Sequence, residues 1–88
     1  MSELGIRILK ILHDKDSDEY VYLKSHSDLQ DFDRDAIQSE AERLTEEGYL
    51  VTVRTDRMIE LDNSLVNYFF EITDTGKSLL SQWTANIS

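Results

Sequence analysis

The middle of the chain, residues 33–55, reads DRDAIQSEAERLTEEGYLVTVRT. Apolar residues recur here at the spacing of one helical face: Ile37, Ala41 and Leu44. Gly48 follows them where helices commonly end in a residue of left-handed conformation, and Asp33 precedes them as a cap. Residues 50–55 then alternate between apolar and polar side chains. The stretch predicts a helix that ends at a glycine turn and is followed by a strand.

A second strand is expected downstream, because residues 66–72 alternate in the same way after turn-forming residues at 62–64. Two such strands joined by a short turn indicate a β-hairpin. Thr73 or Asp74 can cap a final helix, and its apolar stripe consists of Leu79, Leu80 and Trp83. The C-terminal half therefore reads as helix, hairpin and helix.

The N-terminal part predicts a helix over residues 3–13, because apolar side chains share one face of it: Leu4, Ile8, Ile11 and Leu12. The polar run at residues 14–19 ends this helix. Residues 20–23 are aromatic and β-branched, which favours a short strand. A brief helix follows, from a cap at Ser25 or Ser27 to about residue 31.

The expected order is helix, strand, helix, helix, strand, strand, helix, which is an α+β class. No linker composition or internal repeat divides the chain, so residues 1–88 are expected to form one domain. The predicted core consists of apolar residues from all these elements: Ile8, Ile11, Leu12, Leu29, Ile37, Ala41, Leu44, Val53, Phe70, Ile72 and Leu80.

Composition narrows the function classes. The chain has 88 residues, with 18 Asp and Glu against 9 Lys and Arg, so its formal net charge is −9. Such a charge repels phosphate at long range and argues against a broadly basic binding face. The lack of cysteine excludes disulfide scaffolds and thiolate metal sites. Arg7 and Lys10 interrupt the first apolar stretch, so neither a signal peptide nor a membrane span is expected, and the cytoplasm is the expected location.

Three partial motifs each lack a residue or a spacing that the site requires. Residues 14–18 resemble the start of an EF-hand loop, but Glu19 stands where that loop needs glycine. Residues 76–78, GKS, lack the first glycine of a phosphate-binding loop, because Glu71 occupies its position. The two histidines do not have the spacing of a metal pair, and no context activates a nucleophile. We therefore expect no metal, no cofactor and no enzymatic activity.

Two patches resemble the winged helix-turn-helix superfamily. Residues 41–50, AERLTEEGYL, are similar to the end of a recognition helix, and residues 72–80, ITDTGKSLL, to the final strand-to-helix junction. The resemblance is to small bacterial repressors of the phenolic-acid and multiple-antibiotic-resistance kinds, and to small archaeal or prophage domains of this type. It implies a winged-helix fold and a DNA-binding transcriptional regulator.

The resemblance places the helix over residues 33–47 in the recognition position and makes the hairpin the wing. The implied DNA contacts are Arg34, Gln38 and Ser39 on the helix and Arg54 and Arg57 on the wing. The same helix carries six carboxylates against two arginines, which departs from the family pattern.

The alternative is a protein-interaction module whose acidic helix engages a basic protein, as an adaptor or as a protein that occupies a regulator's DNA site. Its contacts would be Asp35, Glu42 and Trp83. Trp83 is expected either in the core, against Ile8 and Leu12, or in a homodimer contact.

Overall fold

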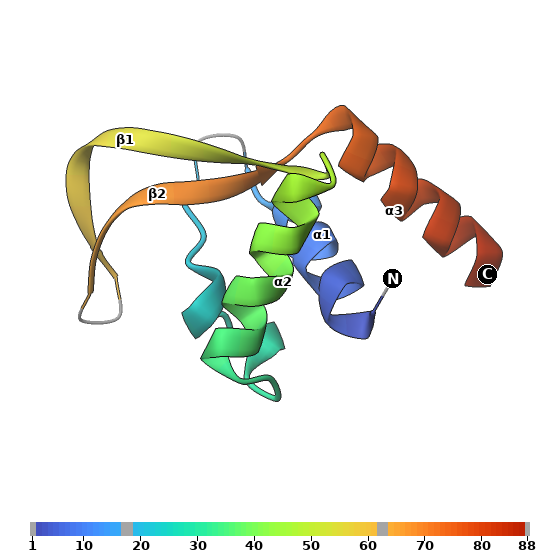
Figure 1. Cartoon of the computed structure of the whole chain (residues 1–88), viewed down its shortest axis with the longest axis horizontal. Helices are drawn as coiled ribbons and strands as arrows, with labels where there is room; N and C mark the ends of the chain where they lie inside the picture. Colours follow the sequence, from blue (N-terminus) through green and yellow to red (C-terminus); the bar gives the residue numbers. More distant parts are fainter. Residues whose placement is uncertain (1, 17–18, 62–63, 88) are drawn as a thin grey trace.

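The computed structural model of the chain describes residues 2–16, 19–61 and 64–87. In chain order its elements are α1 (Glu3–Asp14), the 3-10 helices η1 (Leu23–Ser25) and η2 (Ser27–Leu29), α2 (Arg34–Glu46), β1 (Leu50–Leu61), β2 (Ser64–Ile72) and α3 (Asp74–Ile87). β1 and β2 form an antiparallel hairpin (Figure 1). The described residues thus form an α+β fold of three α-helices and one hairpin, compatible with a winged helix.

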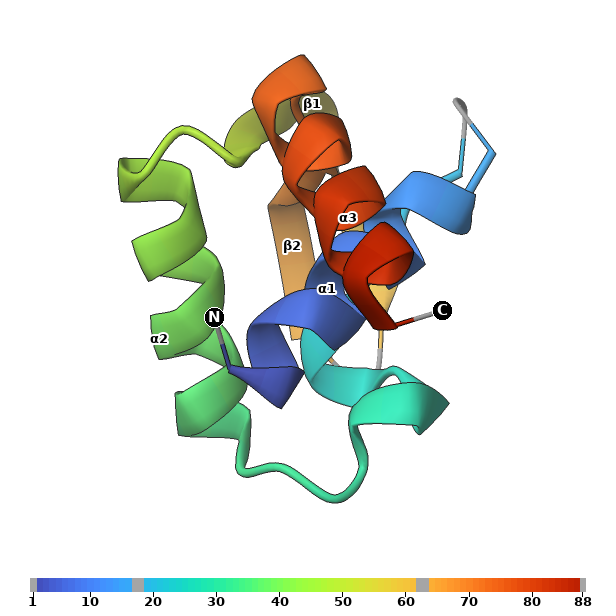
Figure 2. The same cartoon turned by 90° about the vertical axis from the view of Figure 1, so that its right-hand side faces the viewer.

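The core lies where the three α-helices meet the base of the hairpin (Figure 2). Its apolar side chains come from every helical element and from β1: Leu4, Ile8, Leu9, Ile11, Leu12, Leu23, Leu29, Ile37, Ala41, Leu44, Leu50 and Leu80. The helical faces predicted from the sequence are confirmed, since eight of these residues belong to the predicted core. Burial of these faces fixes how α2 is presented at the surface.

The end of α2 is confirmed in detail. Gly48 has a φ of 88°, a left-handed value that residues with a Cβ adopt only at a cost. The Gly48 amide donates to the Thr45 carbonyl at 3.1 Å, and the Tyr49 amide donates to the Leu44 carbonyl at 2.9 Å. This pair of bonds satisfies the last carbonyls of the helix and turns the chain into β1.

Gly76 and Thr73 join α3 to the same corner. The Thr73 hydroxyl donates to the Gly48 carbonyl at 2.7 Å, and it accepts from the Gly76 amide at 3.1 Å, which confirms Thr73 as the cap. A Cβ at Gly76 would lie 2.3 Å from the Tyr49 carbonyl oxygen. Only glycine therefore permits this close approach between α3 and the α2–β1 turn.

The predicted strand at residues 20–23 is wrong. Residues 20–22 have no strand partner, and Leu23 already begins η1. The Tyr22 carbonyl accepts from the Ser25 amide at 3.2 Å, so it is committed to a turn. The segment still contacts β2, because the rings of Tyr20 and Phe69 lie 4.8 Å apart between centroids. Side chains, rather than backbone hydrogen bonds, hold it there.

The predicted helix from residue 25 to about residue 31 is also wrong, because two 3-10 turns replace it. His26 separates them with an extended backbone, at a ψ of 134°. Its ring Nδ1 accepts from the Asp28 amide at 3.1 Å, so His26, rather than Ser25 or Ser27, caps η2. Leu29 is buried as predicted.

The hairpin is longer than predicted and irregular. Regular pairing extends from Leu50 opposite Ile72 to Arg54 opposite Tyr68, and it resumes at Ile59 opposite Val66. The β1 residues between these two segments have no regular partners, and the hairpin curves strongly there (Figure 1). The predicted turn at 62–64 falls mainly on residues 62 and 63, outside the described residues.

Three residues of the predicted core are only half-buried: Val53, Phe70 and Ile72. Phe69 is the buried residue of β2, with 4% of its surface exposed. The reason is that a two-stranded sheet has apolar cover on both faces here. The helical core packs against Phe70 and Ile72 on one face, and the Tyr20 ring contacts Phe69 on the other.

Candidate functional site

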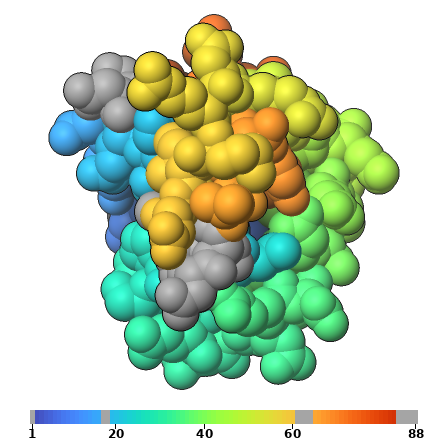
Figure 3. All heavy atoms as spheres, turned by 90° about the vertical axis from the view of Figure 1, so that its left-hand side faces the viewer, coloured from blue at the N-terminus to red at the C-terminus, as the bar shows by residue number. Residues whose placement is uncertain are grey.

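A groove runs between α2 and the hairpin. Its volume is about 380 Å³. The α2 wall consists of Gln38, Glu42, Thr45 and Glu46, and the hairpin contributes Thr52, Arg54, Tyr68 and Phe70. Figure 3 shows the hairpin, yellow to orange, lying beside α2 in green. We call this set of eight residues the α2–hairpin groove.

The floor of the α2–hairpin groove is aromatic. Tyr68 and Phe70 are alternate residues of β2, so their side chains lie on the same face of the sheet. Their rings contact edge to face, with centroids 6.1 Å apart and an interplanar angle of 83°. Both side chains are half-buried. The groove therefore offers a partner some apolar surface as well as charge.

The α2 wall is acidic. Glu42 and Glu46 are one helical turn apart and exposed. Gln38 Nε2 donates to Glu42 Oε1 at 2.9 Å, so the Gln38 amide is already hydrogen-bonded within α2. The Glu46 carboxylate has no hydrogen bond or ion pair with any residue in the described ranges. The single cation that lines the groove is Arg54, and it has no ion pair with another described residue.

Arg43, near the C-terminal end of α2, is held by ion pairs with neighbouring residues. Arg43 forms a hydrogen-bonded ion pair with Glu40 and a second ion pair with Glu47, Nη1 to Oε1 3.6 Å. The hydrogen bond that Arg43 donates to Glu40, followed by the charges of Glu40 and Glu47, raises the pKa of Arg43 above its ordinary value. Its positive charge is therefore already matched within α2.

Of the five residues implied as DNA contacts, two line the same groove. Gln38 and Arg54 line the α2–hairpin groove together. Arg34 and Ser39 are exposed on α2 but do not line the groove. Arg57 lies in the irregular part of β1, where its carbonyl accepts from the Thr55 hydroxyl at 2.6 Å. The structure therefore joins two of the five residues.

The alternative contact set is also divided. Asp35 and Glu42 are exposed on α2 and seven residues apart, which places them on one side of the helix. Trp83 lies on α3, which extends away from the hairpin in Figure 1, and 36% of its surface is exposed. Trp83 thus belongs to another surface than Asp35 and Glu42.

Sequence reasoning missed Glu46, Tyr68 and Phe70 as groove residues. The signals were present in the spacing. Glu46 follows Glu42 by one helical turn, and Tyr68 and Phe70 alternate on the predicted strand. What the sequence could not supply was the placement of this strand face against α2.

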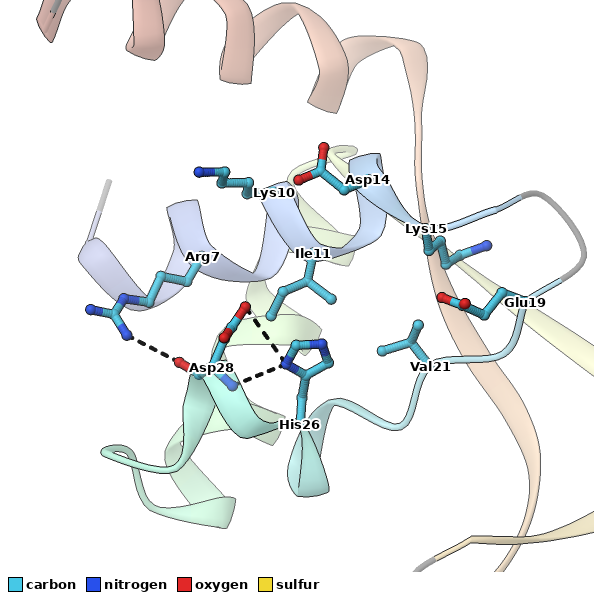
Figure 4. Close-up of a pocket in the computed structure, with 9 residues that line it drawn as sticks. All are labelled: Arg7, Lys10, Ile11, Asp14, Lys15, Glu19, Val21, His26 and Asp28. Atoms are coloured by element: carbon cyan, nitrogen blue, oxygen red, sulfur yellow. Dashed lines mark hydrogen bonds and ion pairs between the residues drawn. The ribbon is translucent and has the colours of Figure 1, made fainter.

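A second open cleft lies on the other side of η1 and η2, between α1 and the segment that leads into η1 (Figure 4). Its volume is about 400 Å³, close to that of the groove. Nine residues line it: Arg7, Lys10, Ile11, Asp14, Lys15, Glu19, Val21, His26 and Asp28. In Figure 4 the side chains of Ile11, Val21 and His26 point into it. We call it the α1 cleft.

Among the described residues that line the α1 cleft, cations and carboxylates are equal in number, with three of each. Several of them are held by internal bonds. Arg7 donates to the Asp28 carbonyl at 3.0 Å and pairs with Glu3 at the same distance. Lys15 Nζ lies 3.2 Å from Glu71 Oε1, and only 8% of the Lys15 side chain is exposed. These contacts tie α1 to η2 and to β2.

Two kinds of feature are absent from the described residues. No group of three or more His, Asp or Glu side chains there is arranged to hold a metal ion. Within the same ranges, no helix has both the length and the apolar character of a membrane span.

Comparisons with protein-family models, with curated proteins and with solved structures found no match for this chain.

Proposed function

We propose that this chain is a non-enzymatic binding module that engages a basic protein segment through the α2–hairpin groove. The observation that supports this most strongly is the lining of the groove. Two exposed carboxylates face one arginine there, over an aromatic floor. Opposite charges steer a basic partner into such a groove, and the aromatic rings add burial.

The bonds within α2 point to the same class of partner. A helix that reads DNA offers donors to base edges and phosphates. Here the Gln38 amide is bonded to Glu42, and the Arg43 guanidinium is bonded to Glu40 and Glu47. These bonds direct donors of α2 toward its own carboxylates, while the net charge of −9 attracts cations at long range.

DNA is the second candidate ligand, because Arg54 and Arg57 have no ion pair with any other described residue. Both lie on β1, the wing of a winged-helix domain, where arginines can contact phosphate. In this reading the chain is a DNA-binding transcriptional regulator, and Arg34, Gln38 and Ser39 add contacts from α2.

One titration separates the two candidates. Fluorescence anisotropy is measured on a labelled alternating glycine–arginine peptide and on a labelled random-sequence duplex, each titrated with the protein. Both titrations are run at low salt and at about 0.15 M, where the Debye length is about 8 Å. We expect salt-sensitive peptide binding and weaker or no duplex binding. Duplex binding tighter than peptide binding would contradict the proposal and favour the DNA-binding reading.

A matched pair of double variants locates the binding surface. Glu42→Lys with Glu46→Lys reverses the α2 wall, and Asp16→Lys with Glu19→Lys makes the same change in net charge near the α1 cleft. We expect the first pair to weaken peptide binding by about tenfold or more and the second by much less. Equal losses would show that the peptide senses total charge rather than the groove.

A further inference from the structure

The α2–hairpin groove has one feature that a simple acidic surface lacks. The Tyr68 ring lies in the floor beside Phe70, and no cation among the described residues is seated over it. Arg54 is the residue directly opposite Tyr68 in the hairpin, but it makes no cation–π contact with that ring. The ring is therefore open to a cation from a partner.

The carboxylates beside the ring have acceptor capacity left. Gln38 occupies Oε1 of Glu42, and no bond to Oε2 is present in the described part of the chain. Glu46 is free of bonds to the other described residues and lies one turn further along α2. A planar group that lies on the ring and donates sideways to a carboxylate satisfies both features at once.

We propose that the partner residue that the groove takes is arginine rather than lysine. The guanidinium is planar, stacks on aromatic rings and donates in a fixed fork that matches a carboxylate. The lysine ammonium is a compact, strongly hydrated charge that gains less from a ring. This inference rests on the proposed function, because it names the residue type of the basic partner.

Arg54 sets the orientation of the partner. Arg54 lies on the hairpin side of the groove, whereas Glu42 and Glu46 lie on the α2 side. A second positive charge is therefore favoured only on the α2 side. The partner arginine is thus directed over Tyr68 toward α2.

The test compares two peptides of equal length and charge, alternating glycine–arginine and alternating glycine–lysine. Their dissociation constants are measured by anisotropy on the intact protein at about 0.15 M salt. We expect the arginine peptide to bind about tenfold more tightly than the lysine peptide. This ratio is measured on the unaltered chain, so it requires no variant that must fold.

Two variants of Tyr68 assign the preference to the ring. Tyr68→Leu keeps an apolar side chain but removes the ring, so the ratio is expected to fall to about one. Tyr68→Phe keeps the ring, so the ratio is expected to persist. Circular dichroism of both variants checks that they fold as the parent does.

The outcomes distinguish the inference from the proposed function. Binding of neither peptide, even at low salt, would overturn the proposed function and the inference with it. Equal binding of the two peptides would overturn the arginine preference and leave the proposed function standing. A preference that persists in Tyr68→Leu would overturn the assignment to Tyr68.

Discussion

The α2–hairpin groove and the α1 cleft have nearly the same volume, about 380 and 400 Å³, but they differ in how their charges are used. In the α1 cleft, cations and carboxylates are equal in number, and Arg7 and Lys15 are held by bonds to neighbouring elements. In the groove, Glu46 and Arg54 have no such bonds among the described residues. Charges of the first kind support the fold, whereas those of the second kind remain available to a ligand.

This difference shows why net charge alone does not define a binding surface. The chain carries −9, yet its carboxylates are spread over loops, α1, α2 and the hairpin. Only where carboxylates stand beside an aromatic floor and lack internal partners do they form a surface with a shape and a chemical preference.

The largest effect is expected from Gly76→Ala, because it disturbs the corner where α3 meets the α2–β1 turn. The added Cβ would lie 2.3 Å from the Tyr49 carbonyl oxygen and 2.8 Å from Ile72 Cγ1. We expect the free energy of unfolding in urea to fall by about 2–4 kcal/mol. Gly48→Ala is the comparison, since a Cβ there meets nothing within 4 Å and only the φ of 88° is unfavourable. It should cost about 1 kcal/mol, and an equal cost for both variants would contradict the close approach at Gly76.

A smaller effect is expected from Lys15→Met, which tests whether cation bonds of the α1 cleft serve the fold. Methionine keeps the apolar stem of this buried side chain but removes the ion pair with Glu71. We expect the free energy of unfolding to fall by about 1 kcal/mol. Binding of the glycine–arginine peptide should stay unchanged, and a large loss of peptide binding would contradict the division between the two regions.

The sequence predicts the features that depend on neighbouring residues better than those that depend on contacts between distant parts of the chain. The helix over residues 33–47 and its end at Gly48 follow from local spacing and from a backbone preference, and both are confirmed. Residues 20–23 also have strand composition, but a strand needs a partner, and the Tyr22 carbonyl bonds to Ser25 instead. Composition could not reveal that competing turn.

The candidate site shows the same limit. The resemblance to winged-helix proteins implied that Gln38 and Glu42 point outward from α2, and both line the groove. Phe70 was predicted as core, but it is half-buried and Phe69 is buried, because alternation alone does not say which strand face is covered more fully. The contact between the rings of Tyr20 and Phe69 covers the Phe69 face, and it joins distant parts of the chain.

Arg54→Ala is expected to change the affinities for the two candidate ligands in opposite directions. It removes the one cation that lines the groove, so the glycine–arginine peptide should bind about threefold more tightly. If DNA is the ligand, the same variant should weaken duplex binding and reduce its salt dependence. Anisotropy titrations of peptide and duplex with this one variant therefore give a sign as well as a magnitude.

The smallest effect is expected from Gln38→Ala. The variant removes the amide that occupies Glu42 Oε1, so peptide affinity should rise about twofold, since one carboxylate oxygen becomes available. Ser39→Ala is the matched control, because Ser39 is the next residue of α2, is exposed and does not line the groove. A rise of the same size in both variants would indicate a general change in α2 instead.

NMR can show directly whether a basic partner binds at the α2–hairpin groove and not at the α1 cleft. Backbone amide shifts of the isotope-labelled chain are recorded during titration with the glycine–arginine peptide. The account predicts shifts concentrated at the groove residues: Gln38, Glu42, Glu46, Arg54, Tyr68 and Phe70. Shifts concentrated at Arg7, Lys10 and Glu19, or spread evenly over all acidic surfaces, would contradict it.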